Sequence, residues 1–336
     1  MATRPTLSQQ RQIDALLAEF GPKIRDAFIA AIYNARGAIS IPELIKALQA
    51  GDIERAVRLF RMDQAALFPL EDAVRGAIIA AGQTVAENAG LSGAFGFNGR
   101  HLRAEALIRE MGATLVQGIQ EDTLNMARTV ITAGLQDGFT PQKVQRELTG
   151  TLNRLTGRRE GGFLGLTTQQ ADSIISGRAK LASGDPALMR EYLDLRLRDR
   201  RFDAMVKRAI RDGKPVSPAD LEKIITAHKN KALRYRGEVI AKNEAFSAQA
   251  AGRDEAYRQA LERADVASVT KKWVHGLSKE PRPDHLRMNG TVIDMDQKFV
   301  MDDGAQMSFP HDPNGGARHS ISCRCTCFYR VILKRD

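Results

Sequence analysis

Apolar residues at helical spacing run through most of this chain, and they constrain its fold more than any other feature. The face of the first expected helix is made by Ile13, Leu17, Phe20, Ile24, Phe28 and Ile32. A later stripe predicts a long helix from about Leu102 to Gly134, and it is made by Ile108, Met111, Leu115, Ile119, Met126 and Val130. Recurrence every three or four residues places such side chains on one helix face. Aromatic residues are only 6% of the chain, so we expect cores of Ala, Leu, Ile and Val between closely packed helices.

Capping side chains and prolines mark the expected helix boundaries. The residues suited to cap a helix start are Asp52, Thr140, Thr167 or Thr168, and Ser217. Prolines at positions 141 and 218 follow two of these caps, at the first helical position, where the missing N–H costs nothing. The dipeptide Phe68–Pro69 predicts a break, because a proline ring disfavours α geometry at the residue before it.

Two glycine-rich segments, residues 90–100 and 156–167, are expected to separate regions of the chain. The first lacks the pattern of a phosphate-binding loop and is interpreted as a flexible connector that Phe95 and Phe97 pin down. A chain of 336 residues is long enough for two or three domains. We predict a mainly α fold with an N-terminal helical region (1–89), a helical domain (90–155), a basic helical region (156–265) and a small C-terminal α+β module (266–336).

Positive charge is concentrated in one part of the chain. The formal net charge is +10, and between Arg190 and Arg236 fourteen Lys and Arg stand against seven Asp and Glu, a local excess of +7. We expect a buried stripe of Leu193, Leu197, Met205 and Ile210. The solvated side would then carry Arg196, Arg200, Arg201, Lys207, Arg208 and Arg211. Such a surface favours sequence-independent contact with DNA phosphates; the alternative is an ordinary solvated face balanced in part by Asp and Glu.

No feature of the sequence predicts a membrane protein. The N-terminal residues lack the apolar core of a secretory signal. No apolar run approaches the roughly 18 residues that a membrane helix needs. We therefore expect a soluble protein made in the cytosol.

Residue types that bind metal or perform acid–base chemistry gather in the last sixty or so residues. All three cysteines, the single tryptophan and four of the six histidines lie there. Trp273 and Val274 are expected to start one strand and Val292–Ile293 another, with a turn at residues 288–290 between them. Residues 322–333 predict a further strand, with Cys323, Cys325 and Cys327 on one face and Arg324 and Thr326 on the other.

Three closely spaced cysteines favour reduced thiols or a metal site over a disulfide framework. Zn²⁺ held by His285, Cys323, Cys325 and either His311 or Cys327 would stabilise a small module with few large apolar residues. Two alternatives stay open at this point. The thiols are buried as small hydrophobic groups, or they form an oxidised or reactive arrangement.

Ordered motifs extend over the last hundred residues. They comprise Ile240, Ala241 and Glu244 on a helix, then Trp273, then Arg282, His285 and Gly290, then Pro310, Asp312 and Pro313, and finally Cys323, Arg324 and Cys325. In this order they resemble the phage Mu F-like minor head proteins, also grouped with the SPP1 head-morphogenesis proteins. Three positions depart from the family pattern. Ser322 stands where relatives often have asparagine, His311 stands where they often have glycine, and a third cysteine, Cys327, extends the alternation.

The resemblance implies a low-copy structural component of a tailed-phage head, made in the host cytoplasm and placed in the virion interior near the portal. It implies the portal protein or major capsid protein and packaged double-stranded DNA as partners, with multiple copies per particle allowed. Roles in head morphogenesis and in genome packaging or ejection follow. We expect no enzymatic activity; the alternative is a metal-dependent nuclease or another DNA-processing enzyme that uses His285 and the cysteines.

Overall fold

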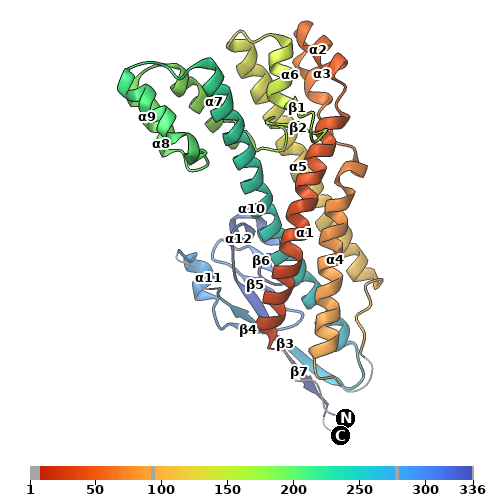
Figure 1. Cartoon of the computed structure of the whole chain (residues 1–336). Helices are drawn as coiled ribbons and strands as arrows, with labels where there is room; N and C mark the ends of the chain where they lie inside the picture. Colours follow the sequence, from red (N-terminus) through yellow and green to blue (C-terminus); the bar gives the residue numbers. More distant parts are fainter. Residues whose placement is uncertain (1–7, 92–94, 277–279, 335–336) are drawn as a thin grey trace. The chain divides into compact units, whose positions relative to one another are not determined.

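Helices dominate the computed structural model, which describes residues 8–91, 95–276 and 280–334 (Figure 1). Within those ranges, strands longer than two residues lie only after residue 265. The predicted mainly α fold with a small C-terminal α+β module is therefore confirmed. None of the helices in the described ranges is long and apolar enough to cross a membrane. The longest helices are α1 (Gln9–Ala38), α4 (Gln64–Asn88), α5 (Leu102–Gln136) and α10 (Pro218–Leu261).

Two compact units are built from interleaved segments of the chain. Unit 1 takes in residues up to 27, residues 69–114 and residues from 238 onward, and unit 2 takes in residues 28–68 and 115–237. Each of the four long helices contributes residues to both units. Each unit is therefore made of segments that are far apart in the sequence.

Unit 2 adds several short elements to its parts of the long helices. These are α2 (Ile41–Gln49), α3 (Ile53–Arg58), α6 (Pro141–Thr149), β1 (Thr151–Leu152), β2 (Arg159–Glu160), α7 (Thr168–Ala182), α8 (Pro186–Asp194), η1 (Arg200–Phe202) and α9 (Asp203–Asp212). Three predicted caps are confirmed, because the side chains of Asp52, Thr140 and Thr167 accept hydrogen bonds at the starts of α3, α6 and α7.

The predicted break at Phe68–Pro69 is wrong, because α4 continues through the proline. Pro69 stands in the second turn of α4, close to the helix end where backbone N–H groups lack partners in any case. The proline therefore removes a single intrahelical hydrogen bond near the N-terminus, and the helix tolerates it.

The second glycine-rich segment belongs to the core of unit 2. Residues 161–166 are buried, and the Arg36 guanidinium donates to the carbonyls of Gly162 (2.8 Å) and Leu164 (2.6 Å). Arg236 donates to the carbonyl of Gly165 (3.0 Å). Burial lowers the pKa of Arg36 to about 10, so it stays charged at neutral pH. Two cations thus satisfy buried backbone carbonyls, and the segment expected as a boundary is a packed loop.

The basic region buries side chains other than those expected. Met189, Tyr192 and Val206 are buried. The predicted stripe is only half-buried along its length, at Leu193, Leu197, Met205 and Ile210. After this region α10 runs unbroken for 44 residues, from the predicted cap at Ser217 through the helix that carries Ile240, Ala241 and Glu244.

The alanine-rich part of α10 packs closely on α4 within unit 1, as its small side chains predict. A Cβ atom placed on Gly252 would lie 2.1 Å from the carbonyl oxygen of Ile78 and 3.0 Å from Cβ of Ala81. Only glycine allows the two helix backbones to approach this closely. Gly252 therefore fixes the spacing of α4 and α10.

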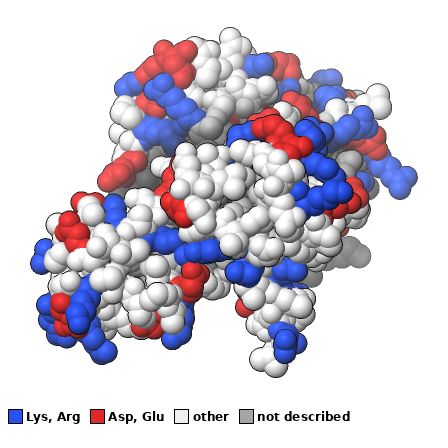
Figure 2. Space-filling view, turned by 90° about the horizontal axis from the view of Figure 1, so that it is seen from above, with Lys and Arg blue, Asp and Glu red and all other residues white. Residues whose placement is uncertain are grey.

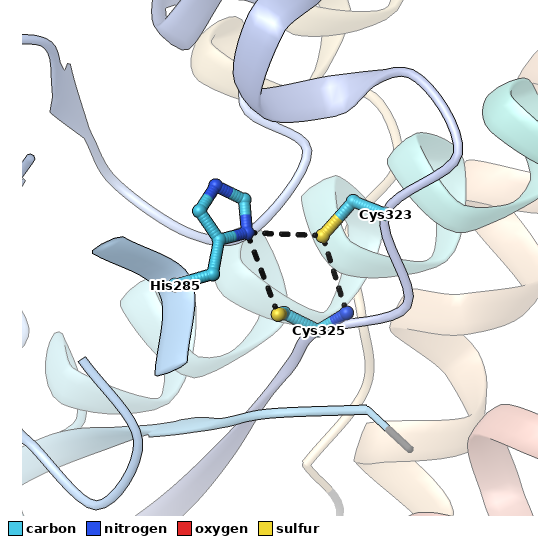
Figure 3. Close-up of side chains that lie close together, drawn as sticks. All are labelled: His285, Cys323 and Cys325. Carbon is cyan, nitrogen blue, oxygen red and sulfur yellow. Dashed lines mark hydrogen bonds between the residues drawn. The ribbon is translucent and has the colours of Figure 1, made fainter. Parts of the chain in front are cut away.

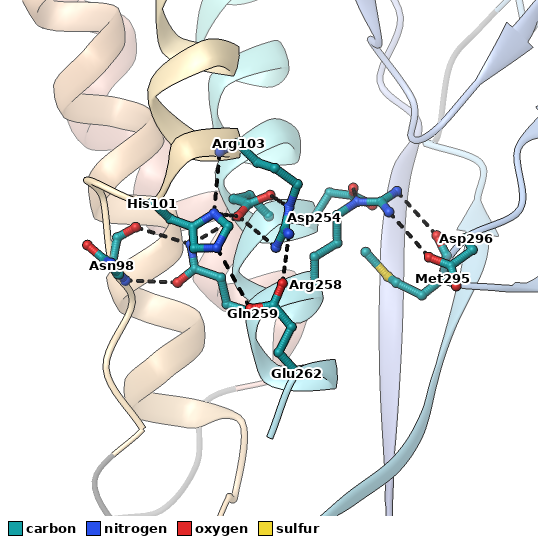
Figure 4. A network of polar contacts seen from close by, with 10 residues as sticks. Asn98, His101, Arg103, Asp254, Arg258, Gln259, Glu262, Met295 and Asp296 are labelled. Carbon is teal, nitrogen blue, oxygen red and sulfur yellow. Dashed lines mark hydrogen bonds and ion pairs between the residues drawn. The ribbon is translucent and has the colours of Figure 1, made fainter. Parts of the chain in front are cut away.

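The described end of the first glycine-rich segment is attached to α10, as Figure 4 shows. The Asn98 N–H donates to Oε1 of Gln259 (2.9 Å), and Nε2 of Gln259 donates to the Asn98 carbonyl (3.1 Å). Arg103 at the start of α5 forms ion pairs with Glu255 (3.2 Å) and Glu262 (2.7 Å). The segment predicted to be a flexible connector is therefore fixed from Asn98 onward.

The two phenylalanines of this segment pack as expected. A Cβ atom on Gly82 of α4 would lie 2.5 Å from the ring of Phe97, so the ring occupies the space that this glycine leaves. The Arg263 guanidinium lies 5.8 Å from the centroid of the Phe95 ring. Residues 92–94 lie outside the described part of the chain.

A three-stranded antiparallel sheet forms the frame of the C-terminal module. Its order is β4 (Val292–Asp294), β3 (Val266–Val274), β7 (Thr326–Leu333), and Trp273 in β3 lies opposite Cys327 in β7. Arg258 of α10 donates to the carbonyl of Met295 just after β4 (3.2 Å, Figure 4). The remaining elements are α11 (Pro283–Arg287), β5 (Phe299–Val300), β6 (Gln306–Met307), η2 (Pro313–Gly315) and α12 (Gly316–Ser320).

Two details of the predicted strands are wrong. Trp273 stands near the end of β3 instead of its start. The last strand begins only at Thr326, so Cys323 and Cys325 lie in the turn before it, and Thr326 is buried together with the cysteines. The predicted turn at residues 288–290 is confirmed, with Gly290 at a φ of +87°.

Candidate functional site

One histidine and two cysteines from opposite ends of the C-terminal module meet in its interior. Nδ1 of His285, on α11, lies 3.4 Å from Sγ of Cys323 and 3.6 Å from Sγ of Cys325 (Figure 3). His285 is 1% exposed, and the cysteines are 4% and 2% exposed. The structure thus brings together three of the four residues predicted to bind metal.

The turn that carries the two cysteines is held by neighbouring elements. The N–H of Ser322 donates to Oδ1 of Asn243 on α10 (2.9 Å), and the Arg282 guanidinium donates to the carbonyl of Ile321 (2.6 Å). Ser322 has a φ of +58°, a region that asparagine enters more readily than serine. The Cys325 N–H donates to Sγ of Cys323 (3.3 Å), a contact that stabilises a thiolate.

The second ring nitrogen of His285 is part of a chain of polar contacts. Nε2 of His285 lies 3.0 Å from Nδ1 of His319, and Nε2 of His319 lies 3.0 Å from Oδ2 of Asp303. The contact with His319 lowers the pKa of Asp303. Asp284 lies near the same pair, with Oδ2 3.6 Å from Nδ1 of His319.

His311 is the fourth residue of the predicted metal set. It is 1% exposed, its ring stacks on Phe246 at a centroid distance of 5.0 Å, and neither ring nitrogen has a hydrogen-bond partner among the described residues. Its backbone has a φ of +71°, which costs a residue other than glycine about 1–3 kcal/mol. The imidazole is close enough to Cys323 to affect its pKa.

The two thiols of the cluster have opposite pKa shifts. A hydrogen bond from Cys325, and then the nearby imidazoles of His285 and His311, lower the pKa of Cys323 against the opposing effect of burial. The same hydrogen bond to Cys323, together with burial, raises the pKa of Cys325. The pair therefore favours one thiolate, at Cys323, even without a cation.

Cys327, the alternative fourth ligand, lies apart from this cluster. It is in β7, where its carbonyl accepts a hydrogen bond from Arg253 (3.2 Å) and its side chain is buried. Burial raises the pKa of its thiol. The expectation of a reduced thiol packed as a small hydrophobic group fits Cys327, and all three cysteines are free of disulfides.

The remaining motif residues shape the walls of the module. Trp273 packs edge-on to His285, with ring centroids 5.4 Å apart, and its carbonyl accepts from the Gly290 N–H (2.9 Å). Asp312, between the buried Pro310 and the half-buried Pro313, accepts from the N–H groups of Ser308 (2.7 Å) and Asn314 (2.9 Å).

Two further residues of the motif set, Glu244 and Arg324, carry ionisable side chains. Glu244 lies on α10, and burial raises the pKa of its carboxyl to about 7. Arg324 is exposed between the two cysteines of the cluster.

The predicted DNA-binding cations belong to unit 2 and precede the residues of this cluster in the sequence. All six, Arg196, Arg200, Arg201, Lys207, Arg208 and Arg211, are exposed as expected. Arg201 is paired with Asp199 (2.6 Å), and Arg196 lies over the ring of Tyr235. Positions 207, 208 and 211 share one face of α9. Figure 2 shows lysine and arginine side chains spread over the visible face, with acidic side chains among them.

Three contributors to the metal-type cluster were not predicted from the sequence. His319 and Asp303 extend the chain of contacts from His285, and Asn243 holds the cysteine turn. His319 offered a signal, since it is one of four tail histidines. Asp303 and Asn243 are ordinary polar residues whose roles depend on the fold.

Comparison with known proteins places part of this chain in context. The family model for phage Mu protein F like protein matches residues 200–328, a range that includes α9 and the whole cluster. Uncharacterized protein YqbB of Bacillus subtilis (strain 168) is 33% identical over 95 residues, which is 27% of this chain and 30% of that relative. The match thus covers less than a third of the relative's length. No solved structure matches the chain.

Proposed function

Because residues 200–328 belong to the phage Mu protein F-like family, we propose that the chain is a minor head protein of a tailed phage. It acts in head morphogenesis as a structural component in the virion. The observation that carries this proposal is the family match across the C-terminal module. The finer role is an association with the portal or major capsid protein on the inside of the head, with a part in genome packaging or ejection.

The exposed cations of α9 and the residues before it support contact with packaged DNA. Among the described residues, Arg200, Lys207, Arg208 and Arg211 have no carboxylate within ion-pairing distance, so they are available to phosphates. Release of counterions from the duplex favours such contacts without reading the base sequence. The proposed contact is therefore non-specific.

Exposed apolar side chains support a protein partner. Leu155, next to β1, is 97% exposed, and Leu102 at the start of α5 is 83% exposed. Such side chains gain free energy when a partner removes them from water. The portal or capsid protein is the proposed partner.

The proposed role is structural and not enzymatic. A metal-dependent nuclease would need the catalytic histidine to reach a phosphodiester, and His285 is 1% exposed. The two cysteines beside it are buried as well. This burial favours a structural cluster over a catalytic one.

A conditional stop codon in the gene tests the proposal in the phage that encodes it. Particles made with the protein should contain it in fewer copies than the major capsid protein, by quantitative mass spectrometry of purified heads. Particles made without it should be misassembled or non-infectious. Absence of the protein from purified heads, with normal infectivity after its loss, would overturn the proposal.

A further inference from the structure

The spacing of the buried histidine and cysteines matches the ligand spacing of a tetrahedral cation. Zn–S bonds of about 2.3 Å and Zn–N bonds of about 2.0–2.1 Å place neighbouring S and N ligands about 3.5 Å apart. Nδ1 of His285 lies 3.4 Å and 3.6 Å from the two sulfur atoms. The three ligand atoms lie within 4.8 Å of one another. A single ion placed among them would reach all three.

His311 supplies an independent observation that points to a ligand. A buried imidazole whose two nitrogens have no partner among the described residues is costly, because its polar atoms are removed from bulk water without a hydrogen bond in return. Its left-handed backbone adds strain. His311 is outside the group of three whose ligand atoms lie within 4.8 Å of one another, so its ring must shift toward Cys323 for one nitrogen to coordinate the cation and gain the partner it lacks.

The contacts of His285 fix the tautomer that coordination requires. When Nε2–H of His285 donates to Nδ1 of His319, Nδ1 of His285 is left unprotonated and faces the sulfurs. Nε2–H of His319 then donates to Asp303. Metal-binding histidines commonly donate their other N–H in this way, which fixes the ring and raises its basicity.

We propose that His285, His311, Cys323 and Cys325 bind one Zn²⁺ ion. The ion links α11 to the turn before β7 and stabilises the C-terminal module. Thiolate and imidazole ligands suit zinc and disfavour Ca²⁺ and Mg²⁺, which take oxygen ligands. A four-ligand set leaves no open position, so the site is structural.

A reactive Cys–His pair is the competing interpretation of the same residues. It would use Cys323 as a nucleophile activated by His285. Its sulfur would have to be reached by a substrate, whereas the Cys323 side chain is buried. It would also leave His311 unpartnered.

Cobalt substitution in the full chain tests the proposal. Protein stripped by a chelator and titrated with Co²⁺ should develop sulfur-to-cobalt absorption and the intense d–d bands of a tetrahedral complex, and Zn²⁺ should abolish both. Protein purified without chelator should carry about one zinc ion per chain. A folded protein that lacks zinc and develops neither absorption would overturn the proposal.

Variants separate the ligands from their neighbours. His311→Gly removes the imidazole and relieves the left-handed backbone strain, so the module should fold. It should keep the sulfur-to-cobalt absorption, change the d–d bands and weaken zinc binding by more than the roughly 10–100-fold of an outer-shell loss. Cys325→Ser should halve the sulfur-to-cobalt absorption.

Cys327→Ala is the matched control, because this cysteine is buried in the same module but lies outside the cluster. It should leave the spectrum and the zinc affinity unchanged. If His311→Gly behaves like this control, or if Cys327→Ala loses thiolate absorption, the assigned ligand set is wrong.

Discussion

Nε2 of His285 lies 3.0 Å from Nδ1 of His319, and when Nε2–H is the donor in this contact, the Nδ1 of His285 that faces the two cysteines carries no proton. The remaining nitrogen of His319 contacts Asp303 at 3.0 Å. An ordered chain of carboxylate, imidazole and imidazole therefore ends at the buried sulfurs. It supports the cluster without adding a ligand.

His319→Ala should weaken zinc binding by about 10–100-fold while leaving about one ion bound at saturation. The loss follows because His285 would no longer be held in the tautomer that exposes Nδ1 to the cation. Competition with a chromophoric chelator measures the affinity. His319→Asn, whose side-chain oxygen can accept the same hydrogen bond, should restore part of it.

Asp302→Asn is the control for the charge of this segment, since Asp302 pairs with Arg287 and is next to Asp303. It should leave zinc affinity unchanged. If His319→Ala behaves like this control, His319 does not position His285.

The basic surface predicts DNA binding that depends steeply on salt and not on sequence. The variant to test replaces four of its residues by glutamine: Arg200, Arg201, Lys207 and Arg208. The slope of log affinity against log salt should fall by about 3, because each phosphate contact contributes about 0.9 and Arg201 is already paired. Fluorescence anisotropy with two unrelated duplexes measures it.

An equal change of charge elsewhere in unit 2 is the control for this experiment. The control variant replaces four exposed cations of other helices and turns by glutamine: Lys46, Arg55, Arg58 and Arg61. Its slope should stay close to that of the unaltered chain. Equal slopes for both variants would remove the specific role of the α9 surface.

Gly252→Ala should destabilise the protein by about 1–3 kcal/mol, because the added methyl group meets the carbonyl of Ile78 and forces α4 and α10 apart. Gly118→Ala in α5 is the matched control, since nothing lies within 4 Å of its added Cβ. It should stabilise by up to about 1 kcal/mol through helix propensity. Urea unfolding followed by circular dichroism compares them, and a neutral Gly252→Ala would contradict the close helix approach.

His228 should make stability fall in mild acid. Burial lowers its pKa to about 4, and its ring packs edge-on to Tyr192. The unfolded chain, with a histidine pKa of about 6.5, binds more protons between these values, so the contribution of neutral His228 is complete above pH 6.5 and is lost as pH falls toward 4. His228→Gln should reduce the loss of unfolding free energy between pH 7 and 4.5 by about 2 kcal/mol. An unchanged pH dependence would contradict a buried neutral imidazole.

Local sequence signals predicted the parts of the fold that depend on local chemistry. The first stripe gave α1 because Ile13, Phe20 and Ile24 are at helical spacing and are buried. Thr140 and Thr167 marked helix starts because a hydroxyl at that position accepts a backbone N–H. The break predicted at Pro69 failed, because the proline stands close enough to the start of α4 that it removes only one intrahelical hydrogen bond.

Contacts between distant segments could not be predicted in this way. The loop around Gly162 looked like a boundary because its anchor, Arg36, is more than a hundred residues away in sequence. In the cluster, His285 and the cysteines stood out by residue type. The contact of Asp303 with His319 depends on how the β5–β6 hairpin and α12 pack, which no spacing in the sequence indicates.

The location of the protein in an assembled head is the most direct test of its role as a minor head protein. Electron cryomicroscopy without imposed symmetry should compare heads made with and without the protein. Extra density is expected inside the shell, next to the portal and in contact with the outermost packaged DNA. Heads that are indistinguishable at the portal, or density confined to the outer surface of the shell, would contradict that role.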